Sequence, residues 1–132
     1  MRSVVYNFIK ALKLKDFKLA EHLPWEADGT ALYLANKKHI YVETAQTKQD
    51  AMYNTLGSQG TVDEITTVKV YFVNDAKILP EGYDSAVNLI KGARLAQGSE
   101  GYVSRTCQVS TAFQEDALVT TFEFSFRKLL TN

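Results

Sequence analysis

The chain has one cysteine, Cys107, and only two prolines among its 132 residues. A single cysteine excludes an internal disulfide, so the cysteine content gives no reason to expect an oxidising compartment. Basic and acidic residues balance at 15 each, which removes any general attraction to nucleic acid or to an acidic membrane surface. No apolar run approaches the roughly 20 residues that span a bilayer, and the first ten residues are too polar for a signal-peptide core. We therefore expect a soluble, cytosolic chain with no membrane partner.

Residues arranged for chemistry are equally scarce. His22 and His39 stand alone, without the His-x-x-x-His or Cys-x-x-Cys spacing of a metal site. Cys107 falls in the middle of an expected strand, where a small buried apolar residue is far commoner than a nucleophile. The glycine-rich segment 98–101 lacks the Lys-Ser/Thr continuation of a phosphate-binding loop. The sequence therefore predicts no catalytic residue, no metal and no cofactor.

What the chain does contain is typical of one globular domain spanning residues 1–132. Its hydrophobic content is 45%, and it has seven Phe and seven Tyr residues, more than a disordered chain would carry. Two segments, 3–14 and 80–97, have apolar residues at helical spacing, and Pro80 suits the first turn of the second helix. The apolar stripes of these two segments consist of Val5, Phe8, Ile9 and Leu12, and of Tyr83, Val87 and Ile90.

Strand patterning is clearest in three segments, 64–74, 103–113 and 118–127, where side chains alternate with period two. Phe122, Phe124 and Phe126 share one face of the last segment, and such a row is typical of a core. Residues 30–34 and 39–44 read as a shorter hairpin whose exposed tip includes Lys37 and Lys38. The expected fold is α+β: a mostly antiparallel sheet of four or more strands, with two main helices packed on it.

Residues 45–61 form the least regular segment of the chain. The segment is polar, contains Gly57 and Gly60, and shows no clean period, so we expect a long loop that is mobile in the isolated chain. Its composition leaves little apolar area to hold it on its own domain. We hypothesise that this loop becomes ordered against a partner, and an ordinary surface loop or a short packed helix is the alternative. The candidate interface residues are Lys37 and Lys38 of the hairpin tip and Lys48, Met52, Tyr53 and Leu56 of the loop.

The order of these elements suggests a family. After the first helix, the pattern is carried by residues 32–34, 40–42, 67–73, 80–84, 110–113 and 121–126. In this order the chain resembles the tail terminator, or tail completion, proteins of long-tailed bacteriophages. The resemblance covers most of the chain as a pattern and includes no specific motif.

The resemblance implies a structural virion protein that forms a homo-hexameric ring, closes the tail tube and joins it to the head connector. Its partners would be further copies of itself, the tail tube protein and the head-completion protein, and genomic DNA would pass through the ring without sequence-specific binding. The protein would be found in the virion neck and, during assembly, in the host cytoplasm. Two alternatives remain open: a small enzyme with a scattered site, and a small-molecule or peptide-binding α+β domain with a pocket lined by Trp25, Tyr53 and Tyr102.

Overall fold

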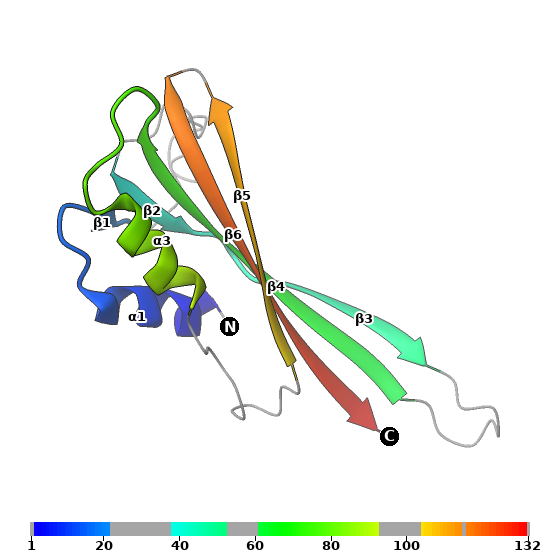
Figure 1. Cartoon of the computed structure of the whole chain (residues 1–132). Coiled ribbons are helices and arrows are strands. Elements are labelled where there is room, and N and C mark those ends of the chain that lie inside the picture. The colour runs from blue at the N-terminus through cyan, green and yellow to red at the C-terminus, as the bar shows by residue number, and fades with distance from the viewer. Residues whose placement is uncertain (1, 22–37, 53–60, 93–103, 115, 132) are drawn as a thin grey trace.

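The computed structural model describes residues 2–21, 38–52, 61–92, 104–114 and 116–131 (Figure 1). These residues form two helices and a six-stranded, mostly antiparallel sheet in a single compact domain, which confirms the predicted α+β fold. No helix in the described part of the chain is long and apolar enough to cross a membrane. The elements are α1 (Arg2–Leu12), β1 (Lys18–Leu19), β2 (His39–Val42), β3 (Gln46–Met52), β4 (Thr61–Asp75), α3 (Tyr83–Lys91), β5 (Ser104–Gln114) and β6 (Ala117–Thr131).

The sheet is built around β4 and β6, which pair antiparallel along all fifteen residues of each strand. The strand order is β1-β2-β4-β6-β5, and β1 and β2 form the parallel pair. On the edge of β4 that faces away from β6, β2 pairs with residues 70–73 and β3 with residues 61–67. Because β2 and β3 follow one another along this edge, the centre of the sheet has pairing partners on both sides.

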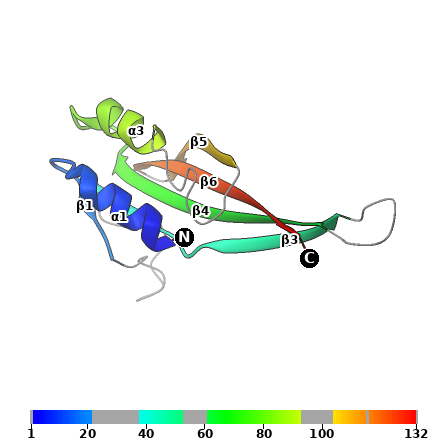
Figure 2. The same cartoon turned by 90° about the horizontal axis from the view of Figure 1, so that it is seen from below.

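Both helices lie on one face of the sheet, toward one end of it (Figures 1 and 2). Val5 and Ile9 of α1 and Ala86 and Ile90 of α3 are buried, as expected for residues at helical spacing on one side of each helix. The strands contribute alternate residues to the same core, which consists of Ile40, Val42, Val68, Val70, Phe72, Phe122, Phe124 and Phe126. The predicted phenylalanine row is therefore confirmed as core.

A second, smaller cluster lies on the opposite face of the sheet. It comprises Tyr41, Val73, Ala117 and Val119, with Ala20 and Tyr71 packed against it. Tyr41 and Val73 alternate along their strands with Ile40 and Phe72 of the main core, so their side chains project to the other side. At this end the sheet is thus apolar on both faces.

The other end of the sheet extends past the helices as a three-stranded blade, defined here as β3 with residues 61–67 of β4 and 125–131 of β6 (Figure 1). Residues 46–50 of β3 are exposed on both faces. The expectation of a loop over residues 45–61 is therefore wrong for Gln46–Met52, which pairs antiparallel with β4. Hydrogen bonding to a long neighbouring strand holds this segment, and neither of its faces needs apolar residues.

The remaining predicted strands and helices can be compared with the observed elements one by one. The strands predicted at 64–74, 103–113 and 118–127 are present and slightly shifted or longer. The helix predicted at 3–14 and the strand predicted at 39–44 are also present, but each ends two residues earlier than predicted. The helix predicted from residue 80 begins at Tyr83, after a turn in which the Tyr83 N–H donates to the Pro80 carbonyl at 3.0 Å. The predicted strand 30–34 and residues 93–97 of the predicted second helix lie outside the described residues. Pairing of β1 with β2 was not predicted.

Candidate interaction surfaces

The described residues contain no group of three His, Cys, Asp or Glu side chains placed to hold a metal ion. His39 stacks on Tyr41, with ring centroids 6.1 Å apart. Burial raises the pKa of the Cys107 thiol, against a smaller opposing effect of Arg105 and Lys91. A thiol with a raised pKa stays protonated near neutral pH and is a poor nucleophile. Cys107 therefore fits the packing role predicted for it.

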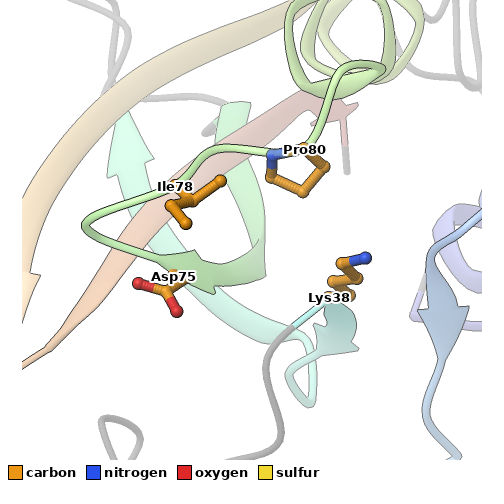
Figure 3. A pocket seen from close by; sticks show the side chains of 4 residues that line it. All are labelled: Lys38, Asp75, Ile78 and Pro80. Atoms are coloured by element: carbon orange, nitrogen blue, oxygen red, sulfur yellow. The ribbon is translucent and has the colours of Figure 1, made fainter.

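A hollow of about 290 Å³ lies between the loop that follows β4 and the start of β2 (Figure 3). Lys38, Asp75, Ile78 and Pro80 line it, and the Asp75 carboxylate accepts a hydrogen bond from the Lys77 N–H at 2.9 Å. The described lining thus offers one ammonium, one carboxylate and two apolar side chains. It includes no thiol, hydroxyl or imidazole that could act as a nucleophile or base.

The structure separates the predicted interface residues. Lys38 is exposed, adopts a left-handed backbone conformation with φ of 64°, and forms part of the hollow beside β2. Lys48 lies on β3 in the blade, where its exposed ammonium is 3.8 Å from Asp50. Met52 is the last residue of β3. Lys37, Tyr53 and Leu56 lie outside the described residues, as do Trp25 and Tyr102 of the alternative pocket.

The blade is held by polar contacts between its strands. Thr47 and Thr66 hydroxyls lie 3.1 Å apart, and the Gln49 amide donates to the Glu64 carboxylate at 2.9 Å. On the opposite face, Arg127 Nε donates to Asp63 at 2.8 Å, a contact that raises the pKa of Arg127. Polar cross-strand pairs of this kind specify register while leaving both faces hydrated. These contacts make the blade mainly hydrophilic, with Leu129 of β6 as an exposed apolar residue.

The face of the sheet without helices is also polar through its middle. Lys69 lies opposite Glu123 in the β4–β6 register, and the Tyr71 hydroxyl donates to Glu43 at 2.9 Å. Partial burial, followed by the hydrogen bond to Glu43, raises the pKa of Tyr71 well above its ordinary value near 10. The resulting protonated phenol ties β4 to the residues between β2 and β3.

Strand β5 forms one edge of the sheet among the described residues. It pairs with β6 along its whole length and has no second strand partner in the described chain. Every residue from Gln108 to Phe113 is exposed, and the side chains of Val109 and Phe113 retain 38% and 73% of their accessible surface. The sequence showed the alternation of β5 but gave no sign that its apolar residues would lie outside the core. This exposed edge strand is the candidate interaction surface that sequence reasoning missed.

The comparisons with known proteins leave these surfaces unassigned. No protein-family model matches the sequence, and a search of curated proteins finds no relative.

Proposed function

We propose that this protein is a ring-forming structural subunit, the tail terminator of a long-tailed bacteriophage, which caps the tail tube and joins it to the head connector. The observation that best supports the proposal is that the two sides of the described sheet differ, with the uncharged edge strand β5 on one side and the charged strand β3 on the other. An interface between two different patches of the same chain is heterologous, and repeated heterologous contacts close into a ring when the rotation allows. Addition of a partner segment to an exposed sheet edge such as β5 is an established mode of protein association.

The blade adds a second argument for a structural role. It reaches beyond the helices (Figure 2), and residues 46–50 of β3 are exposed and all polar. A subunit that must contact a tube below and a connector above needs surface away from its own core. The blade supplies such surface without exposing the phenylalanine row.

A stop codon introduced at Lys48 in the encoding genome tests this role. If the protein terminates tails, infected cells should accumulate DNA-filled heads and separate tails of irregular length, visible by negative-stain electron microscopy. Supplying the intact chain in trans should restore joined particles. Particles of normal tail length, joined to heads without the intact chain, would contradict the proposal.

The alternative of a small-molecule or peptide-binding domain stays a prediction and has its own test. A tail terminator should assemble to about six times the mass of one chain on docking to its tube protein, as measured by light scattering. A pocket protein should remain a monomer or dimer and should bind its ligand in that state. The hollow beside Lys38 is at the lower end of the roughly 300–1,000 Å³ typical of ligand sites.

A further inference from the structure

The edge formed by β5 lacks the devices that usually prevent strands from pairing with other chains. Residues 106–114 contain no charged residue, no proline and no glycine. Natural sheets protect their edges with charges, prolines, bulges or very short strands. The opposite edge follows this rule, because β3 carries Lys48 and Asp50, both exposed. An unprotected edge of this length in the same molecule is expected to have a partner.

The exposed side chains of β5 indicate the nature of that partner. Val109 and Phe113 lie on the helix-bearing face, since they are opposite Phe122 and Leu118 of β6. Every second residue of a strand lies on the same face, and both are an even number of residues from Cys107, which lies opposite the core residue Phe124. Both are large apolar groups whose exposure to water is unfavourable by about 25 cal/mol for each Å². A partner strand should therefore bring apolar side chains to this face and no unpaired charge.

A second copy of β5 meets these requirements. In an antiparallel pair centred on Thr111, Phe113 of each copy lies opposite Val109 of the other. Ala112 then lies opposite Ser110, and Gln114 opposite Gln108, so that no charge enters the paired stretch. Residues directly opposite share a face of the sheet, so both helix layers would lie on the same side. A register centred on Ser110 instead places Phe113 opposite Cys107 and Val109 opposite Thr111, which leaves the apolar pair unmatched.

The one charged residue of β5 does not interfere with this pairing. Arg105 lies outside the paired stretch, and its guanidinium donates to the Lys91 carbonyl at 2.7 Å. The same guanidinium carbon lies 5.2 Å from the centre of the Phe124 ring, a cation–π arrangement that holds the side chain on its own subunit. Repulsion between two copies of Arg105 is therefore avoided.

We infer that two copies of the free protein pair through β5, antiparallel and centred on Thr111, to form a closed dimer with one continuous sheet. The contact is isologous, so it ends at two subunits and does not propagate into fibres. The inferred dimer does not depend on the proposed tail terminator role, because it follows from the properties of β5 alone. In a tail terminator the dimer would cover β5 until docking on the tube favours the ring.

A cysteine at the centre of the pair tests both the contact and its register. Thr111→Cys, in a Cys107→Ala background, places two thiols opposite each other, with Cα atoms about 4.5–5.5 Å apart. This separation is within the range that a disulfide bridges. Thr106→Cys in the same background is the matched control, because it replaces an exposed threonine of the same strand. The inferred register keeps the two Thr106 positions roughly 33 Å apart, at about 3.3 Å per residue.

Under mild oxidation at micromolar concentration, the Thr111→Cys protein should convert almost wholly to a linked dimer, at least tenfold faster than the Thr106→Cys control. Equal rates for the two variants, or a wild-type chain that stays monomeric at all concentrations in sedimentation equilibrium, would overturn the inference. A ring that assembles on the tube without a Thr111 crosslink in the free protein would leave the proposed function standing and reject the dimer.

Charge at the edge gives an independent check. Phe113→Lys should raise the dimer dissociation constant at least tenfold, because it places a lysine opposite Val109 of the second copy. Gln46→Lys adds the same charge to the exposed β3 edge and should leave the dissociation constant unchanged. Circular dichroism of both variants should match that of the wild type, since neither side chain is part of the core. A dimer that is equally stable in both variants would contradict pairing through β5.

Discussion

At the scale of single residues, the main core depends on aromatic rings that touch each other. Phe124 is fully buried and lies 6.5 Å from Phe126, ring centre to ring centre, in a stacked arrangement. Phe72 meets Phe17 edge-on at 4.8 Å and is tilted against Tyr83 at 5.6 Å. Such contacts add to the burial of apolar area, so removing one ring affects several neighbours.

Phe124→Ala should therefore lower the free energy of unfolding by about 3–5 kcal/mol, because it leaves a cavity in the packed layer. Lys48→Ala, on the exposed face of β3, should change it by less than about 0.5 kcal/mol. Urea denaturation of the two variants measures both values. Similar losses in the two would mean that the buried face of β6 has been misassigned.

Asn74 is the residue whose chemistry fits its position least well. It is fully buried in β4, and neither its amide nitrogen nor its amide oxygen has a hydrogen-bond partner among the described residues. A buried polar group without a partner costs about 1–3 kcal/mol. Asn74→Leu keeps the branched shape of the side chain and should raise the free energy of unfolding by about 1 kcal/mol. The same change at exposed Asn88 is the control and should have little effect, and a destabilised Asn74→Leu protein would show that the amide is needed.

At the scale of elements, the passage from β2 to β3 determines how far the sheet extends. The Glu43 N–H donates to the Lys69 carbonyl at 2.9 Å, so pairing with β4 continues past the end of β2. The Glu43 carboxylate accepts a hydrogen bond from the hydroxyl of Tyr71, which lies on β4 like Lys69. These two bonds direct the chain from the helix-covered half of the sheet into the blade.

The Tyr71 contact makes stability depend on alkaline pH. Burial and the bond to Glu43 raise the pKa of Tyr71 in the folded state above its unfolded value near 10. The stabilisation is therefore complete below about pH 10 and is lost as the pH rises toward the folded-state pKa. We expect the urea midpoint of the wild type to fall more steeply between pH 9.5 and 11 than that of Tyr71→Phe. Parallel declines in the two proteins would show that the phenol is not perturbed.

At the scale of the whole molecule, the helices cover only part of the sheet. Residues 70–73 of β4 lie under the main core, whereas residues 61–67 lie in the blade. Both stretches have a strand on either side, so their backbone hydrogen bonding is comparable. Any difference in local stability between them must then come from the packed layer of side chains and helices.

Hydrogen exchange along β4 should reveal this difference. Amides at 70–73 should exchange only on global unfolding, and amides at 62–65 should exchange at least tenfold faster through local opening of the blade. Ile9→Ala, which thins the helix layer, should reduce protection at 70–73 and leave 62–65 nearly unchanged. Uniform protection along the strand would indicate that the blade is as stable as the core.

The sequence predicted those elements in which burial imposes a period. Val68, Val70 and Phe72 alternate with half-buried or polar neighbours, and Val5 and Ile9 recur at helical spacing, so their elements were recognised. Strand β3 was missed because residues 46–50 are hydrated on both faces, which removes the period-two signal. Strand β1 has only two residues, too few to show a period. The exposure of Val109 and Phe113 depends on how far α1 and α3 extend over the sheet, which the pattern of β5 alone does not indicate. The exposed edge strand β5 could therefore be recognised as a candidate surface only from the three-dimensional arrangement of the elements.

The pairing of β4 with β6 also governs how the molecule can fold. Thr67 and Ser125 lie opposite each other in the sheet but 58 residues apart in the sequence. The two strands that carry most of the core must close a long loop before any of their contacts form, and chains dominated by such distant pairings fold in milliseconds to seconds rather than microseconds. During that interval the phenylalanines of β6 have no β4 to cover them. The architecture that gives the chain its long sheet thus favours slow folding, with the most apolar strand exposed before the native state forms.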